Sequence, residues 1–142
     1  MLKLHTQAVI HQFESLTLDS IDQLVALYDS QASFKDPFNE VTGHPAIRRI
    51  FTHMFSQVNH PRFHIKDIIE QNSQACLSWE FHFEFKSSPD KTQTIKGCTW
   101  FVFNESGLII SHRDYWDAAE ELYEKLPYLG GLMKWLKKKA QH

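Results

Sequence analysis

Residues 28–38 read Tyr-Asp-Ser-Gln-Ala-Ser-Phe-Lys-Asp-Pro-Phe, and this stretch decides the fold. It predicts a short strand over residues 32–36 that ends at Pro37, because proline has no N–H for a sheet ladder. A turn over residues 39–43 follows, and Pro45 stands where the first turn of a helix tolerates proline. The stretch therefore predicts a strand, a turn and a helix in close succession.

Helical periodicity extends on both sides of this stretch. Before it, apolar residues recur on one helical face over residues 2–16, and Asp19 is the predicted N-cap of a second helix that reaches Tyr28. After it, Phe51 belongs to the apolar stripe of a third helix, which ends at residues 59–61. Three helices are therefore predicted in the first half of the chain.

Strand patterns fill most of the second half. They cover residues 63–70, 75–85, 92–103 and 108–116, and short turns join them. The last of these turns carries Gly107 at the position that must take a positive φ. Short connections imply antiparallel pairing, and helices followed by strands indicate the α+β class rather than alternating βαβ units.

Length and charge exclude several classes of protein. The chain has 142 residues, which fits one domain with a core and a cavity. Its net charge is −2 and its only strong basic cluster is at Lys134 and residues 137–139, so we expect no nucleic acid as partner. No run of about 18 apolar residues occurs, so we expect no spanning helix and no membrane partner.

The cysteines and the first residues indicate a cellular compartment. Cys76 and Cys98 lie in predicted strands, and two cysteines in a chain of this length form no disulfide framework. Residues 1–16 carry His, Gln and Glu through the segment that a signal peptide would keep apolar. A cytoplasmic protein with reduced cysteines is the natural interpretation.

Two motifs resemble the family of ketosteroid isomerases and SnoaL-like polyketide cyclases, within the nuclear-transport-factor-two-like class. The first is residues 28–43 with the helix that follows, and the second is residues 103–109 with Tyr115 and Trp116. The resemblance covers most of residues 20–117. It implies a cone-shaped fold, in which a curved, mainly antiparallel sheet is wrapped by the three helices around a small apolar pocket.

The C-terminal 25 residues lie beyond this resemblance. We interpret residues 1–142 as one domain, with a core cone over 1–116 and a helical extension over 117–142 that Asp117 caps. The apolar side chains of the extension are predicted to form a lid over the cone mouth or a neighbouring subunit, while its lysines stay in water. They are Leu129, Leu132, Met133 and Trp135.

Asp36 is a candidate catalytic residue. In the ketosteroid isomerases the Asp before Pro-Phe is the general base that removes a proton next to a carbonyl, and Asp36 stands at that position. The alternative is that Asp36 only shapes the Asp-Pro turn by accepting backbone N–H bonds. The two oxyanion donors of those enzymes fall near Gln12 and Thr99, which are weaker donors, so a true steroid isomerase is not expected.

His112 and Asp114 are the other candidate catalytic residues. Residues two apart on a strand share a face, and the family points the residues that end at Trp116 into the pocket. A His beside a carboxylate in an apolar cavity can act as an acid or base, although a purely structural pair is the alternative. The resemblance implies that Gln12, Tyr28, Phe38, Phe51, Phe55, Thr99, Phe101 and Trp116 line the site.

Residues 79–85 leave a choice of face open. Four aromatic side chains alternate there with Glu80, His82 and Glu84. The family spacing favours the polar stripe facing the cone, but a one-residue slip reverses the choice. No metal is expected, because ligands from a single strand rarely complete a site, and no cofactor is predicted.

Two functions follow as hypotheses. The first is an enzyme that moves a proton on a small apolar carbonyl or hydroxyl compound, in an isomerisation, cyclisation or dehydration. The second is a binding module of the same fold without catalysis. The resemblance implies a homodimer through the sheet face in either case.

Overall fold

The protein is built on one six-stranded sheet with the strand order β2-β1-β6-β5-β4-β3. The computed structural model describes residues 1–121 and 138–140. The strands are β1 (Tyr28–Lys35), β2 (Glu40–Thr42), β3 (Val58–Gln71), β4 (Gln74–Phe85), β5 (Ser88–Phe103) and β6 (Ile109–Tyr115). The helices are α1 (Leu4–Glu14), the 3₁₀ turn η1 (Leu18–Ser20), α2 (Ile21–Val25), α3 (His44–Gln57) and α4 (Ala118–Glu121).

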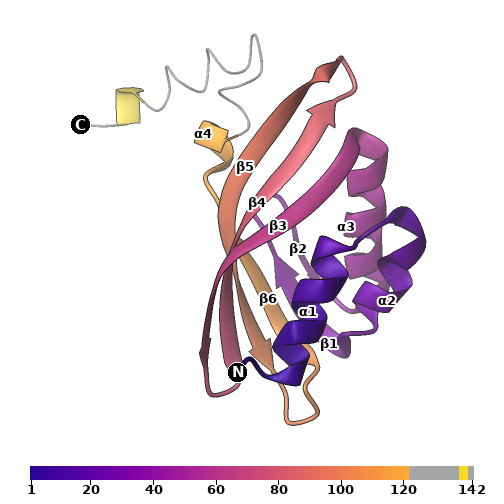
Figure 1. Ribbon diagram of the computed structural model, residues 1–142, viewed down its shortest axis with the longest axis vertical. Coiled ribbons are helices and arrows are strands. Elements are labelled where there is room, and N and C mark those ends of the chain that lie inside the picture. Colours follow the sequence, from indigo (N-terminus) through magenta and orange to yellow (C-terminus); the bar gives the residue numbers. More distant parts are fainter. Residues whose placement is uncertain (122–137, 141–142) are drawn as a thin grey trace.

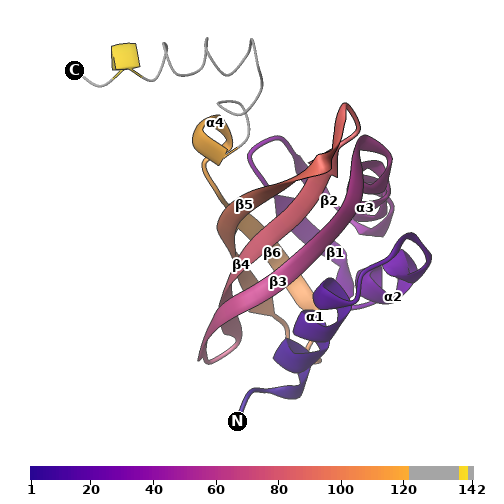
Figure 2. The same ribbon diagram turned by 45° about the horizontal axis from the view of Figure 1, so that its top comes forward.

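The sheet is curved and covered by helices on one face. β1 pairs with β6 in parallel, and the other neighbouring strands pair antiparallel. Figure 1 shows α1, α2 and α3 on the same side of the sheet, and Figure 2 shows the long strands β3, β4 and β5 twisting past them. Among the described helices none covers the opposite face, which we call the outer face. The predicted α+β class and its curved, mainly antiparallel sheet are confirmed.

The main core fills the space between the helices and the inner face of the sheet. Tyr28, Phe34 and Phe101 are its largest fully buried side chains, and Ile47 of α3 and Val9 of α1 pack with them. Burying an aromatic or branched aliphatic side chain contributes about 1.5–3 kcal/mol. The helices are therefore held to the sheet chiefly by apolar contact.

Several element boundaries differ from those predicted. β1 begins at Tyr28 because this residue is 1% exposed and packs in the core as a strand residue. Thr17, not Asp19, begins the first turn, where its side chain and that of Ser20 form a capping box. β3 begins at Val58, since a bulge between Asn59 and Arg62 admits the intervening proline into the strand.

Other local predictions are confirmed. Gly107 has a φ of 81°, and Asn104 accepts the backbone N–H of Ser106 and Leu108 to close the β5–β6 turn. The Asp117 carboxylate accepts the backbone N–H of Glu120 at 3.0 Å and so caps α4. Both cysteines are free. The predicted lid residues Leu129, Leu132, Met133 and Trp135 lie outside the described residues.

Gly97 of β5 is expected to resist substitution. A Cβ atom there would lie 2.7 Å from Trp79 Cη2 and 2.9 Å from Trp116 Cβ, closer than side chains approach. Gly97→Ala is therefore expected to lower the free energy of unfolding by about 1–3 kcal/mol in denaturant titrations. Lys96→Ala, a change at the exposed neighbouring position, should stay within about 0.5 kcal/mol of the wild type. Equal stability of Gly97→Ala and wild type would show that the two indoles can shift freely.

Candidate functional site

A cavity of about 1030 Å³ opens between the inner face of the sheet and α3. Its walls are mainly aromatic, with Phe51 from α3, Phe63 from β3 and a stripe of side chains from β4. Asp36, Phe38 and Trp116 also line it. A volume of this size accommodates an organic molecule with one or more rings.

The aromatic stripe of residues 79–85 faces this cavity. Trp79, Phe81, Phe83 and Phe85 line it, and Trp79 and Phe83 are almost fully buried. The family spacing, which favoured the polar stripe facing inward, is therefore wrong for this strand. The physical reason is burial, because pointing four large aromatic rings at water would cost far more than exposing the polar stripe.

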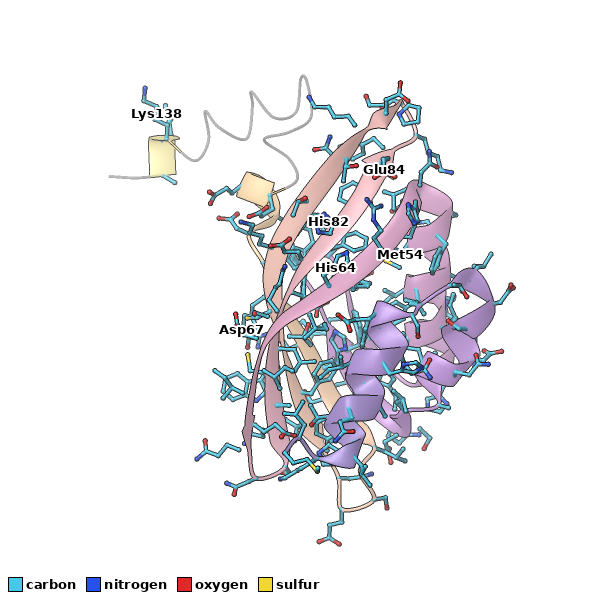
Figure 3. The ribbon with its side chains drawn as sticks, in the orientation of Figure 1. Met54, His64, Asp67, His82, Glu84 and Lys138 are labelled. Carbon is cyan, nitrogen blue, oxygen red and sulfur yellow. The ribbon has the colours of Figure 1, made fainter. Side chains whose placement is uncertain are left out.

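The polar stripe of β4 lies on the outer face instead. Glu80 contacts His82 at 3.2 Å, and Glu84 contacts Arg62 of β3 at 3.2 Å. The rings of His82 and His64 pack edge to face (Figure 3). These groups satisfy one another across the strands, away from the cavity. The described residues contain no group of three or more His, Cys, Asp or Glu side chains that could hold a metal ion.

The inner end of the cavity contains a chain of hydrogen bonds through five side chains. The indole Nε1 of Trp79 donates to Thr99 Oγ1 at 2.8 Å, and the Thr99 hydroxyl donates to Asp114 Oδ1 at 2.5 Å. His112 Nε2 lies 2.7 Å from the same oxygen. The Tyr28 hydroxyl lies 2.8 Å from His112 Nδ1. The chain thus joins β1, β4, β5 and β6 at one point.

The direction of each hydrogen bond follows from the chemistry of the groups. An ionised carboxylate only accepts, so His112 carries its proton on Nε2 and donates it to Asp114. Its Nδ1 is then a lone-pair acceptor for the Tyr28 hydroxyl. A neutral His112 in this tautomer satisfies both of its ring nitrogens. Both branches of this hydrogen-bond chain therefore end at Asp114: Trp79 through Thr99, and Tyr28 through His112.

The two oxygens of Asp114 differ in their hydrogen bonds. Both hydrogen bonds end on Oδ1, and Oδ2 accepts none from the residues that the structure describes. The Asp114 side chain is 17% exposed and borders the large cavity. It also borders a small inner chamber of about 30 Å³, lined by Thr99, Phe101 and His112 among others. A ligand that fills the inner end therefore meets a carboxylate fixed on one side and available on the other.

The Tyr28 phenol begins one end of this hydrogen-bond chain as a donor. Burial, and then the charge of Asp114, raise the pKa of the Tyr28 phenol well above its ordinary value of 10.0. The phenol therefore keeps its proton across the neutral range and can donate to His112.

Tyr28→Phe is expected to lower the free energy of unfolding by about 1–3 kcal/mol near neutral pH, because it leaves Nδ1 of the buried His112 without its donor. The pKa of the Tyr28 phenol is raised in the folded state. Its contribution to the free energy of unfolding is therefore complete below about pH 10 and decreases as the pH rises above that value. The variant should show a shallower alkaline loss. Denaturant titrations at neutral pH and above pH 10 measure both effects, and identical curves for the two proteins would contradict the assigned hydrogen bond.

Asp36 forms the turn after β1. Its Oδ1 accepts the backbone N–H of Phe38 at 2.8 Å and of Asn39 at 2.6 Å. The side-chain amide of Asn39 lies 3.1 and 3.2 Å from the two carboxylate oxygens. The carboxylate lines the large cavity, but most of its acceptor positions take hydrogen bonds from its own loop. This is the geometry of the turn-forming alternative.

The structure brings some predicted site residues together and separates others. His112, Asp114, Thr99 and Tyr28 form one hydrogen-bonded unit, which contains no bond to Asp36. Phe38, Phe51 and Trp116 line the large cavity, and Phe101 lines the inner chamber.

Three predicted lining residues, Gln12, Tyr28 and Phe55, line neither the cavity nor the chamber, and Tyr28 reaches the site only through its hydrogen bond to His112. Gln12 precedes the buried Phe13 on α1 and is itself only partly buried, about 100° further round the helix. Phe55 packs against the main core instead. The sequence also gave no sign of Trp79 as a hydrogen-bond donor, because an alternating aromatic stripe indicates only which side chains share a face.

Comparisons with known proteins identify the family. A model of the SnoaL-like domain matches residues 9–112. Among curated proteins none matches the sequence. Within residues 1–121 and 138–140, no helix combines the length and apolar character needed to cross a bilayer.

Solved structures share the fold at low sequence identity. An NTF2-like protein of unknown function from Burkholderia pseudomallei K96243 is 15% identical with a TM-score of 0.74, over 84% of this chain and 95% of that one. A hypothetical protein with a ketosteroid isomerase-like fold from Catenulispora acidiphila, in complex with trimethylamine, is 13% identical with a TM-score of 0.73, over 86% and 92%. A Mycobacterium tuberculosis protein in complex with estradiol-17β-hemisuccinate is 16% identical with a TM-score of 0.66, over 80% and 92%.

These likenesses establish the cone fold, and the family model establishes the membership. The matched residues 9–112 include the second half of α1, most of the sheet and the His112 of the hydrogen-bonded unit. They make up well over half of the chain. The chain belongs to the family of SnoaL-like domains.

Proposed function

We propose that the protein binds a small, largely apolar ring compound in the cavity and accepts a proton from it at Asp114. This is the chemistry of an isomerase, a cyclase or a dehydratase. The observation that carries the proposal is the position of the Asp114 carboxylate, which is held on Oδ1 by two buried donors and available on Oδ2 at the inner end of the cavity. A base needs such fixed geometry within hydrogen-bond reach of the proton that it removes.

The size and character of the cavity support a small organic ligand. Its volume is about 1030 Å³ and most of its wall is apolar. Two structural neighbours hold small organic molecules, namely trimethylamine and estradiol-17β-hemisuccinate.

Each polar residue of the site has a role in this proposal. Asp114 is the proton acceptor. His112 is a positioning residue that orients the Asp114 carboxylate, together with Thr99. Asp36 shapes the loop at the mouth rather than acting as the base, because N–H donors of its own loop bind both of its carboxylate oxygens, whereas only one oxygen of Asp114 is bound.

Binding without catalysis is a second candidate, and one observation favours it. In the inner chamber the hydrogen-bond donors of Trp79, Thr99 and His112 are all used within the protein. None of them is left to stabilise an oxyanion, which a proton transfer next to a neutral carbonyl would create.

The proposal is tested with 5-nitrobenzisoxazole, a neutral ring compound that needs only a base. Removal of its C–H proton forms the third bond of a nitrile while the N–O bond breaks, and a coloured phenolate appears. We expect saturable catalysis by the wild type, about 100-fold or more above the same concentration of acetate. A rate no greater than that of acetate would reject the catalytic proposal and leave the binding module.

We also propose that two copies associate through the outer face of the sheet. Ile69, Cys76 and Trp100 occupy one row across β3, β4 and β5, and Tyr115 of β6 lies beside them. Ile69 is 70%, Trp100 48% and Tyr115 45% exposed. An apolar patch of this kind, on a face that no described helix covers, is typical of a protein interface. A second copy of the chain presents the same patch and is the occupant that we propose.

A further inference from the structure

The inner chamber offers a ligand an acceptor but no donor. Its polar side chains are Trp79, Thr99, His112 and Asp114, and its other walls are apolar. Trp79 donates its N–H to Thr99 Oγ1, and Thr99 and His112 donate their hydrogens to Asp114 Oδ1. Only Asp114 Oδ2 is left over for a ligand among the described polar groups of the chamber. The matching group on a ligand must therefore give a proton or carry positive charge.

This asymmetry decides which proton transfers the site can support. Removing a proton next to a neutral carbonyl places negative charge on oxygen, and that charge needs donors which the chamber lacks. Removing a proton next to a cationic nitrogen instead cancels a charge. The product is neutral and needs no donor at all. A base without an oxyanion site is thus suited to a cationic substrate.

The electrostatics of the walls favour the same ligand. The carboxylate of Asp114 is nearly buried, and its hydrogen-bond partners in the described part of the chain are Thr99 and His112, with no Lys or Arg among them. An uncompensated buried charge is unfavourable, and a cationic ligand would compensate it. The surrounding aromatic faces of Phe51, Phe63 and Trp79 attract cations through their ring quadrupoles.

The basic residues that border the large cavity do not border the inner chamber. Arg48, Arg49 and His53 are on the exposed side of α3 and line only the large cavity. Arg48 is paired with Asp22 at 2.8 Å. Exposed charges are screened by water and salt, so they oppose a cation at the inner end only weakly.

We infer that the ligand of this cavity carries a cationic nitrogen, as in an iminium ion or an N-alkylated heteroaromatic ring. The inference rests on the proposed function and specifies its substrate class. In the proton transfer, the C–H bond next to the C=N⁺ group breaks and the proton goes to Asp114 Oδ2. The C–H electron pair forms a C=C bond, and the π pair of C=N⁺ moves to nitrogen. The product is a neutral enamine.

A matched pair of probes tests the charge. The cation 1,2-dimethylquinolinium and the neutral hydrocarbon 1,2-dimethylnaphthalene have nearly the same shape. Their binding is followed by the change in tryptophan fluorescence, because two of the four tryptophans, Trp79 and Trp116, line the cavity. We expect the wild type to bind the cation at least about tenfold more tightly, although the hydrocarbon is the more hydrophobic probe. In D₂O, the protein should also speed deuterium exchange at the 2-methyl group of the cation.

Asp114→Asn is the decisive variant. Its amide keeps an acceptor for Thr99 and His112 and puts an N–H where Oδ2 stood, so the preference for the cation should fall below about threefold. The same variant should bind the neutral ketone 2-tetralone more tightly than the wild type does. Glu105→Gln removes an equal charge at the exposed β5–β6 turn and should change nothing.

Two kinds of binding result would overturn the inference. Equal or tighter binding of the hydrocarbon by the wild type would show that charge is not recognised. A cation preference that survives in Asp114→Asn, or disappears equally in Glu105→Gln, would show that Asp114 is not its source. Either result leaves the test with 5-nitrobenzisoxazole untouched, because that substrate is neutral. A cation preference without turnover of 5-nitrobenzisoxazole would instead keep the inference and remove the catalytic part of the proposed function.

Discussion

Asp114→Asn is expected to lower the rate of 5-nitrobenzisoxazole opening about 100-fold or more, with a change in KM below about threefold. The amide has nearly the shape of the carboxylate and can still accept the hydrogen bonds of Thr99 and His112, so the cavity should keep its form. It cannot accept a proton near neutral pH. The loss should therefore fall on kcat, as measured by steady-state kinetics of phenolate release.

Asp36→Asn is the matched control for this prediction. It removes a carboxylate from the mouth of the same cavity, while the amide oxygen can still accept the backbone N–H bonds of Phe38 and Asn39. Its kcat should stay within about threefold of the wild type, and thermal melting should show both variants folded. A hundredfold loss in Asp36→Asn with little change in Asp114→Asn would reverse the two assignments and restore Asp36 as the base.

Trp100→Glu is expected to convert the proposed dimer to monomers, with a dissociation constant raised about 100-fold or more. Trp100 is 48% exposed at the centre of the outer face, between Cys76 and Arg113 in neighbouring strands. Two copies related by a two-fold axis would bring two glutamates close together in place of two indoles. Sedimentation equilibrium of the wild type and the variant measures the change.

Leu18→Glu is the control for the dimer prediction. Leu18 is 58% exposed on η1, away from the strands of the outer face, so its replacement should leave the association unchanged. A wild type that is monomeric at high concentration, or a Trp100→Glu variant that stays dimeric, would rule out the outer face as the interface. A loss of association in Leu18→Glu would place the interface on the helical side.

Much of the fold could be predicted from local signals. The Asp36-Pro37 stop, the Gly107 turn and the alternation in residues 79–85 each depend on backbone or side-chain rules that act over a few residues. Boundaries were wrong where packing or a bulge decided them, as at Tyr28, which the core holds as a strand residue, and at Val58, where a bulge admits Pro61.

The site was predicted less completely, because its chemistry depends on contacts between distant strands. Alternation correctly put His112 and Asp114 on one face, and they contact each other at 2.7 Å. Nothing in the sequence linked Tyr28 to His112, which are 84 positions apart, or gave the role of Trp79. Asp36 could not be separated into base or turn residue without its hydrogen bonds, since both roles use the same side chain at the same place.

We propose above that Asp114 Oδ2 receives the proton of a ligand at the inner end of the cavity. A crystal structure of the protein with 5-nitrobenzotriazole, which resembles 5-nitrobenzisoxazole but has an N–H in place of the reacting C–H, tests it most directly. We expect the ring to lie among Phe51, Phe63 and Trp79, with a ring nitrogen about 2.7–3.2 Å from Asp114 Oδ2. A ring bound at the mouth against Asp36, with Oδ2 of Asp114 facing no part of it, would show that Asp114 is not the proton acceptor.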